Sequence, residues 1–150
     1  MFMEEYNNQL RLVMEVFIIV YDNLSDIPTR YINSITEAID IILSYSLNEL
    51  ETIILFGSCA RLNLHVGSDI DIAIVTKNSI TDRSVRGGLR SDLETLSTGI
   101  DCDLTLMTTE IMNMMENNRL RDNIKKDGII LWEGGKFTDD YKQLLRYCYK

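Results

Sequence analysis

Two pairs of aspartates with Asp-x-Asp spacing are the first sign of chemistry in this 150-residue chain. Asp69 and Asp71 form one pair, and Asp101 and Asp103 form the other. Residues two positions apart on a β-strand point to the same face of the sheet, so each pair presents two carboxylates together. Carboxylate oxygens are the ligands that hard divalent cations prefer. Because Asp-x-Asp alone is also typical of a solvated strand face, the interpretation depends on what surrounds it.

A Gly-Ser turn upstream of the first pair favours a binding site over a solvated face. Gly57 and Ser58 follow the apolar segment 52–56, and ten residues separate Ser58 from Asp69. Glycine lets the backbone approach a ligand closely, and a helix that begins at Ser58 directs free N–H groups and a positive dipole end toward an anion. Arg61 lies one turn further on, where its guanidinium group either faces the same phosphates or pairs with an acidic side chain. The turn is not a Walker A loop, because no lysine stands at the position that this motif requires.

The second pair of aspartates adds to the first if their two strands are neighbours. Residues 100–107 alternate between apolar and polar side chains, which is typical of a strand, and Asp101 and Asp103 share its polar face. If this strand lies beside the one expected at 70–75, three or four carboxylates converge. Such a cluster would hold two divalent cations and could also deprotonate a hydroxyl nucleophile.

Together these motifs resemble the signature of the polymerase-β-type nucleotidyltransferase superfamily, and most of all that of its minimal nucleotidyltransferases. The resemblance rests on residues 56–61, 68–71 and 103–106, and it extends over residues 53–133. It implies that the nucleotide is bound by Gly57, Ser58, Arg61 and Ser68. It also implies that two Mg²⁺ ions are held by the catalytic carboxylates Asp69, Asp71 and Asp103. Asp103 is preferred to Asp101 because the third acid of the family usually precedes a hydrophobic run.

ATP or another nucleoside triphosphate is the substrate that this resemblance implies. The expected reaction moves a nucleoside monophosphate, AMP in the case of ATP, to a hydroxyl acceptor. Minimal nucleotidyltransferases that resemble antitoxins adenylylate a helical HEPN-type toxin, so a partner protein is the first candidate acceptor. A small hydroxylated antibiotic is the alternative acceptor. A third hypothesis is a non-catalytic, antitoxin-like binding module that neutralises its partner by occlusion alone.

Hydrophobic periodicity predicts the elements that must position these residues. Apolar residues at helical spacing predict helices over 4–24, 25–47, 82–96, 108–126 and 138–149, with one or two further turns over 58–64. Short β-branched or alternating runs predict strands over 52–56, 70–75 and 100–107, and residues 128–132 form either a short strand or an extended segment. The expected fold is therefore α/β (or α+β), with a small mixed β-sheet of three to five strands flanked by helices in a nucleotidyltransferase core.

A single structural domain accommodates all of these elements. We expect residues 1–50 to form an N-terminal helical segment packed on the core, residues 51–133 to form the nucleotidyltransferase core, and residues 134–150 to form a C-terminal helix. The apolar run 17–21 covers more than one face of its helix, which favours packing against a second subunit and hence a homodimer. His65 is the only histidine, and we expect it to be a surface loop residue.

The charge balance narrows the class of partner. The chain has 15 basic and 23 acidic residues and a net charge of −8, of which residues 1–50, with eight acidic and two basic residues, supply −6. A protein that binds nucleic acid by neutralising phosphates needs clustered Lys and Arg, so a nucleic-acid partner is not expected. No apolar run reaches the roughly 18 residues of a membrane span. Residues 1–5 also lack the cationic n-region of a secretory signal, so we expect a cytoplasmic protein. Cys59, Cys102 and Cys148 are far apart in the sequence, and we expect them to be free thiols.

Overall fold

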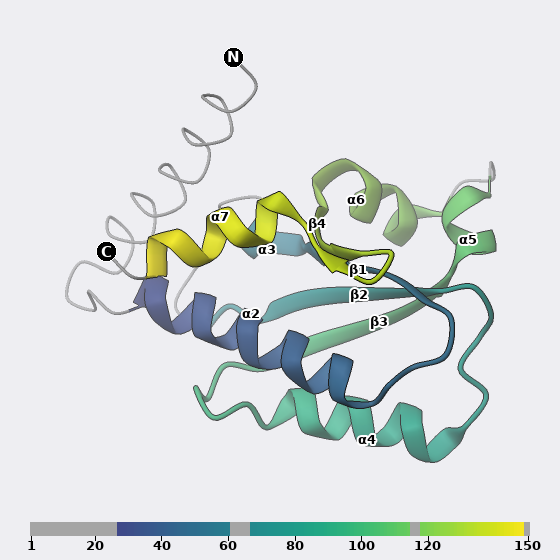
Figure 1. Cartoon of the computed structure of the whole chain (residues 1–150), viewed down its shortest axis with the longest axis horizontal. Coiled ribbons are helices and arrows are strands. Elements are labelled where there is room, and N and C mark those ends of the chain that lie inside the picture. Colours follow the sequence, from purple (N-terminus) through teal and green to yellow (C-terminus); the bar gives the residue numbers. More distant parts are fainter. Residues whose placement is uncertain (1–26, 61–66, 115–117, 149–150) are drawn as a thin grey trace.

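The structure is a computed structural model, and its described residues are 27–60, 67–114 and 118–148 (Figure 1). The helix predicted over 4–24 with its apolar run 17–21 lies outside the described residues, as do Arg61 and His65. Within the described ranges, every helix is too short or too polar to cross a membrane.

In the part of the chain that the structure describes, five strands form one mixed sheet in the order β3-β2-β1-β4-β5. They are β1 (Leu50–Phe56), β2 (Ile70–Thr76), β3 (Cys102–Thr108), β4 (Ile129–Glu133) and β5 (Lys136–Phe137). β2 and β3 run parallel, and the other neighbouring strands are antiparallel. A mixed sheet flanked by helices confirms the predicted fold class. The strands predicted over 52–56 and 70–75 are also confirmed, and the one predicted over 100–107 is confirmed from Cys102 on. Of the segment 128–132, residues 129–132 belong to β4, and Gly128 caps the end of the preceding helix.

β5 is a strand that the hydrophobic patterns do not predict. It is two residues long and pairs with β4 across Gly134 and Gly135. Both glycines have positive φ angles, +59° and +88°. Two consecutive residues in this conformation are typical of the type I′ hairpin turn, for which Gly-Gly is a favoured sequence. The Gly134-Gly135 pair is therefore the sequence feature that indicates a hairpin turn, and hence a strand, after β4.

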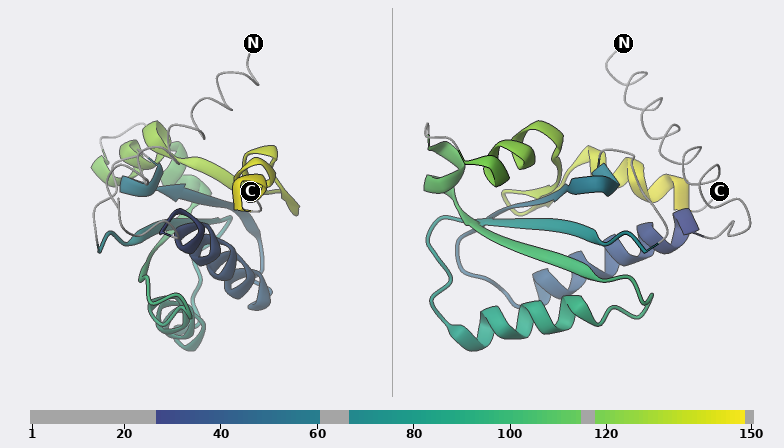
Figure 2. Two further views of the ribbon diagram at one scale, coloured as in Figure 1. Left: turned by 90° about the vertical axis from the view of Figure 1, so that its left-hand side faces the viewer. Right: turned by 180° about the vertical axis from the view of Figure 1, so that it is seen from behind.

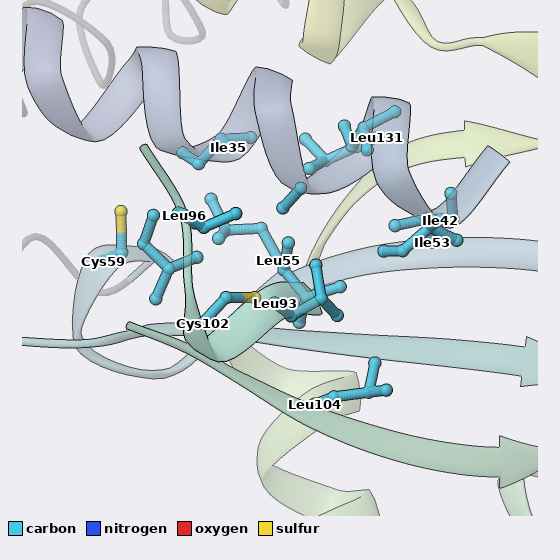
Figure 3. Close-up of a cluster of buried hydrophobic side chains, with 14 of the residues drawn as sticks. Ile35, Ile42, Ile53, Leu55, Cys59, Leu93, Leu96, Cys102, Leu104 and Leu131 are labelled. Atoms are coloured by element: carbon cyan, nitrogen blue, oxygen red, sulfur yellow. The ribbon is translucent and has the colours of Figure 1, made fainter. Parts of the chain in front are cut away.

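One face of the sheet carries the larger hydrophobic core. It is covered by α2 (Ile27–Ser44), α4 (Arg83–Glu94) and α7 (Asp139–Cys148) (Figure 2). The helices bury one apolar stripe each against alternate strand residues, as amphipathic helices do. Residues of this core include Ile35, Ile42, Ile53, Leu55, Leu93, Leu96, Cys102, Leu104 and Leu131 (Figure 3). The helices predicted over 25–47, 82–96 and 138–149 are confirmed within the described residues, where the first ends at Ser44 and the second at Glu94.

The opposite face carries a smaller core together with the aspartates. α5 (Thr109–Asn113) and α6 (Arg119–Asp127) lie over this face (Figure 1). The buried residues of this second core are Ile54, Phe56, Ala73, Val75, Met107 and Ile124. On the same face, Asp71 is half-buried and Asp103 is exposed. Helices α5 and α6 therefore cover this face over the second half of β2 and β3. The Asp71 and Asp103 carboxylates lie near the start of these strands.

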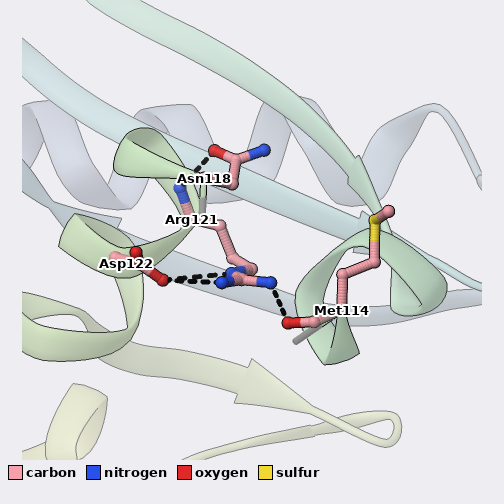
Figure 4. Close-up of polar contacts among 4 residues, drawn as sticks. All are labelled: Met114, Asn118, Arg121 and Asp122. Carbon is pink, nitrogen blue, oxygen red and sulfur yellow. Dashed lines mark hydrogen bonds and ion pairs between the residues drawn. The ribbon is translucent and has the colours of Figure 1, made fainter. Parts of the chain in front are cut away.

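The prediction of one helix over 108–126 is wrong. α5 and α6 are separated at Met114, whose backbone is extended (φ −62°, ψ 141°). Asn118 then caps α6, because its side-chain oxygen accepts a hydrogen bond from the Arg121 N–H at 3.0 Å. The buried Arg121 guanidinium spans the break by donating to the Met114 carbonyl and pairing with Asp122 at 2.8 Å (Figure 4). Asparagine favours caps over helix interiors, so Asn118 marked this boundary in the sequence.

α4 continues through Gly87 and Gly88 despite the low helix propensity of glycine. Gly88 has a packing role, since a Cβ atom there would lie 2.7 Å from the Tyr45 hydroxyl oxygen. That hydroxyl donates a hydrogen bond to the Asp92 carboxylate at 2.5 Å. The glycine therefore lets the end of α2 approach α4 closely.

Candidate active site

Gly57 and the Asp71 carboxylate are in direct contact. Gly57 is the first residue of α3 (Gly57–Ala60), directly after β1, and its φ of +75° is one that residues with a side chain rarely adopt. A Cβ atom at this position would lie 2.1 Å from Asp71 Oδ2. The carboxylate therefore fills the space that any side chain at position 57 would need. The helical turns predicted over 58–64 are confirmed as far as Ala60, and residues 61–64 lie outside the described residues.

Asp71 and Asp103 are direct partners across the parallel pair β2 and β3. Direct partners in a ladder point to the same face, so the two carboxylates stand side by side. On its other side, Asp71 pairs with Phe56, the last residue of β1. This register is a geometric reason to prefer Asp103 to Asp101 as the third carboxylate.

Asp69 lies one position before β2 and is electrostatically coupled to the second pair. Its neighbour Ile70 donates a backbone hydrogen bond to the Asp101 carbonyl at 3.0 Å. Burial raises the pKa of Asp69, and the negative charges of Asp101 and Asp103 raise it further. A nearby like charge disfavours the ionised form of a carboxyl group. The structure thus brings the two Asp-x-Asp pairs together at the start of two adjacent strands.

The donor chemistry of this cluster fits a hard divalent cation, because the clustered side chains offer carboxylate oxygens. Among the described residues, no three His, Cys, Asp or Glu side chains are close enough together to hold a metal ion by themselves. Mg²⁺ in nucleotide enzymes is commonly held by one or two carboxylates, with substrate phosphates and waters completing its coordination. The donor set is therefore compatible with a cation whose remaining ligands are substrate phosphates and water.

The serines expected at the nucleotide lie on both sides of the segment that is not described. Ser58 is half-buried in α3, next to Gly57. Ser68 is also half-buried, and its carbonyl oxygen accepts a hydrogen bond from the Tyr31 hydroxyl at 2.8 Å. Tyr31 is a residue near the site that the motifs do not reveal, because it precedes Ser68 by 37 positions and lies in the apolar stripe of α2. Arg61 lies outside the described residues.

Two buried cysteines flank the aspartates. Burial raises the pKa of Cys59 to about 12, and the charge of Asp71 contributes to the rise. Burial likewise raises the pKa of Cys102 to about 12, with added contributions from Asp71, Asp103 and Asp69. The thiolate is the nucleophilic and metal-binding form of cysteine, so these thiols are inert at neutral pH. Both are free, which confirms the prediction for Cys59 and Cys102.

Comparisons with known proteins identify a family. Residues 36–136 match the family model described as "Polymerase beta, Nucleotidyltransferase". This range contains Gly57, Ser58 and both Asp-x-Asp pairs. No curated protein matches the chain.

Similar solved structures include three toxin–antitoxin complexes. One is a toxin–antitoxin with AMP-PNP, 27% identical, covering 73% of this chain and 80% of that chain, with a TM-score of 0.46. A second is the toxin–antitoxin MntA-HepT, which is 25% identical. The match covers 74% of this chain and 80% of that chain, with a TM-score of 0.41. A third is a tri-AMPylated Shewanella oneidensis HEPN toxin in complex with MNT antitoxin, which is 23% identical. The match covers 75% of this chain and 82% of that chain, with a TM-score of 0.42.

All three TM-scores are below 0.5, so the identification rests on the family model, which matches more than half of the chain. The chain belongs to the polymerase beta nucleotidyltransferase family.

Proposed function

We propose that this protein transfers AMP from ATP to a hydroxyl group on a partner protein, with Mg²⁺ bound at the aspartate cluster. The observation that carries this proposal is the pairing of Asp71 with Asp103, with Gly57 in contact with Asp71. This arrangement gathers the carboxylates and the phosphate-binding turn at one end of one sheet face. Family membership gives the reaction class, and the donor, the metal and the acceptor are what the proposal adds.

Each residue of the site has a defined task in this reaction. Gly57 and Ser58 hold the β- and γ-phosphates through backbone N–H groups and the Ser58 hydroxyl. Asp69, Asp71 and Asp103 would hold the Mg²⁺ ions. When bound, these ions neutralise phosphate charge and stabilise the pyrophosphate leaving group.

The bond changes of the transfer follow from these positions. Asp103 accepts the proton of the acceptor hydroxyl. The hydroxyl oxygen then forms a bond to the α-phosphorus, while the bond from the α-phosphorus to the oxygen that bridges it to the β-phosphate breaks. Pyrophosphate leaves with that bridging oxygen and its electron pair, and the acceptor carries AMP as a phosphodiester.

The charge distribution supports a triphosphate substrate. Residues 51–100 hold six acidic and five basic residues, and residues 101–150 hold nine and eight, so each segment has a net charge of −1. The acidic excess belongs to residues 1–50. A nearly neutral catalytic segment repels a metal-bound nucleotide far less than a chain with evenly spread charge would.

The proposed acceptor is a helical HEPN-type toxin, and its AMP modification would neutralise it. The resemblance of residues 56–61, 68–71 and 103–106 to minimal nucleotidyltransferases supports this choice. The acidic balance of the chain supports a protein acceptor over a nucleic-acid acceptor. The experiment must distinguish AMP transfer to the toxin from two other outcomes. One is transfer to an antibiotic, and the other is neutralisation of the toxin without catalysis.

The test uses ATP labelled at the α-phosphate, Mg²⁺ and two kinds of acceptor in separate reactions. One acceptor is a purified helical toxin of the HEPN type, and the other is a panel of hydroxylated antibiotics. We expect label on the protein, and no label on it when the ATP carries its label at the γ-phosphate. The double variant Asp69→Asn with Asp71→Asn should lose transfer and keep its fold, as judged by circular dichroism.

Asp40→Asn is the matched control, because it removes an exposed carboxylate from α2, which covers the other face of the sheet. This control should transfer AMP at the parental rate. Unchanged transfer by the double variant would overturn the carboxylate assignment. If only an antibiotic becomes labelled, the acceptor is a small molecule and not the toxin. If the toxin is neutralised without becoming labelled, the result favours the non-catalytic binding module.

A further inference from the structure

The Tyr31 hydroxyl connects helix α2 to the chain segment that leads into the first aspartate pair. Tyr31 is buried, with 3% of its surface exposed, and its hydroxyl donates to the Ser68 carbonyl oxygen at 2.8 Å. α2 covers the sheet face opposite to Asp71 and Asp103. The contact therefore reaches the site from the side of the core rather than from the side on which substrate binds.

The position of this hydrogen bond in the backbone gives it a specific effect. Asp69 precedes β2, so it lies outside the strand ladder. The peptide group after Asp69 is held because Ile70 donates its N–H to the Asp101 carbonyl at 3.0 Å. The peptide group before Asp69 contains the Ser68 carbonyl, which Tyr31 holds. Both peptide groups that flank Asp69 are therefore fixed, although Gly67, just upstream, is exposed with a φ of +85°.

The same helix also holds the segment that leads into the second aspartate pair. Arg30 donates from Nε to the Thr98 carbonyl at 2.9 Å. The fully buried Ser34 hydroxyl lies 2.5 Å from the Thr98 hydroxyl oxygen. Residues 30–34 of one helix thus fix both the approach to β2 and the approach to β3.

We propose that Tyr31 is a positioning residue for the carboxylate site, and that its hydroxyl holds the Asp69 carboxylate near Asp71 and Asp103 by fixing the Ser68 carbonyl. The inference rests on the proposed metal-dependent transfer. Without the hydroxyl, the peptide group between Ser68 and Asp69 rotates more freely, and the Asp69 carboxylate spends less time where it can share a cation with its partners. A misplacement of about 1 Å in such a site lowers a rate by up to about 100-fold.

The test compares Tyr31→Phe with Tyr45→Phe. Each variant removes one tyrosine hydroxyl that makes a hydrogen bond, but Tyr45 bonds to Asp92 on α4, away from the aspartate pairs. The first measurement is binding of Mn²⁺ in the presence of a non-hydrolysable ATP analogue, followed by electron paramagnetic resonance, which needs no acceptor. The second is the transfer rate as a function of Mg²⁺ and ATP concentration.

We expect Tyr31→Phe to weaken Mn²⁺ binding by about fivefold and to lower kcat by about tenfold, with the KM for ATP nearly unchanged. Tyr45→Phe should match the parent protein in both measurements, even if it lowers the melting temperature as much as Tyr31→Phe does. Equal Mn²⁺ binding by Tyr31→Phe and the parent would overturn the inference.

Asp71→Asn separates this inference from the proposed function. If Asp71→Asn lowers Mn²⁺ binding and Tyr31→Phe does not, only the role of Tyr31 is wrong. If the parent protein binds no Mn²⁺ with the nucleotide, or if Asp71→Asn binds it as well as the parent, the proposed function fails and the role of Tyr31 fails with it.

Discussion

The Asp71 carboxylate occupies the space beside the Gly57 Cα, at 2.1 Å from where a Cβ atom would stand. Gly57→Ala should therefore lower both stability and activity. The backbone at φ +75° and the displaced carboxylate should together cost about 1–3 kcal/mol of unfolding free energy, and the displacement should reduce transfer by about 100-fold.

Gly134→Ala is the matched control for this substitution. Gly134 has a φ of +59°, and nothing lies within 4 Å of the added Cβ. It should lose about 1 kcal/mol from backbone strain alone and keep its activity. Urea unfolding and the AMP transfer assay measure the two effects, and equal activity losses in both variants would contradict a contact between Gly57 and Asp71.

Asp69→Asn should stabilise the protein in the absence of metal while impairing its reaction. Burial raises the pKa of Asp69, and Asp101 and Asp103 add to the rise, so ionisation of this carboxyl opposes folding. The cost is absent well below the usual pKa of 3.8 and is complete above the raised value. Because the side chain is largely exposed, the expected gain at pH 7 is only about 0.5 kcal/mol.

Urea unfolding of Asp69→Asn and the parent at pH 7 and at pH 3, without divalent cations, measures this effect. The gain should be much smaller at pH 3, where the Asp69 carboxyl is mostly protonated in both the folded and the unfolded chain. Asp40→Asn on α2 should show no comparable gain. A lower stability of Asp69→Asn at pH 7 would show that Asp69 is not repelled by its neighbours.

Alkaline pH should destabilise the protein through its buried thiols. Burial raises the pKa of Cys59 and of Cys102 from 9.0 to about 12. Between these values the unfolded chain loses thiol protons that the folded chain keeps, so stability falls as pH rises. Each thiol should contribute a slope of about 1.4 kcal/mol per pH unit. Cys59→Ala should have a shallower slope than the parent over pH 9 to 11, and an equal slope would show that Cys59 ionises in the folded state.

Two adjacent glycines in α4 should respond differently to alanine. A Cβ at Gly87 meets nothing within 4 Å, so Gly87→Ala should raise the unfolding free energy by about 1 kcal/mol through helix propensity. A Cβ at Gly88 would stand 2.7 Å from the Tyr45 hydroxyl oxygen and would disturb its bond to Asp92. Gly88→Ala should therefore gain less than Gly87→Ala in thermal unfolding, and a reversed order would refute the close packing at Gly88.

Local patterns were sufficient to predict the face of each aspartate, because strand parity depends only on spacing. Asp71 and Asp103 stand on one face of β2 and β3 as the alternation indicates. The sequence predicts that Asp71 and Asp103 lie side by side only if their two strands are neighbours. Neither the alternation of side chains nor the composition shows which strands are adjacent. The coverage of the rest of that face by Ile124 and its neighbours was also invisible, because it depends on where α6 packs.

Contacts made by individual polar groups account for most of what the hydrophobic patterns missed. Tyr31 looked like one more apolar residue in the stripe of α2, and its hydrogen bond to Ser68 exists only in the folded chain. The break at Met114 depends on the Asn118 cap, which the hydrophobic spacing across 108–126 concealed. Periodicity describes which face of an element is apolar, whereas these features depend on individual polar atoms.

The parallel pairing of β2 and β3 constrains how the length of this protein can vary in evolution. A shift of one residue in that pairing would place Cys102 or Leu104 opposite Asp71 and would turn Asp103 toward the larger core. Insertions and deletions in residues 95–101 would cause such a shift, because these residues lead directly into β3. Residues 77–82 leave β2 at its other end, where added length moves no aspartate. We therefore expect homologous chains to differ in length in residues 77–82 and to keep one length in residues 95–101.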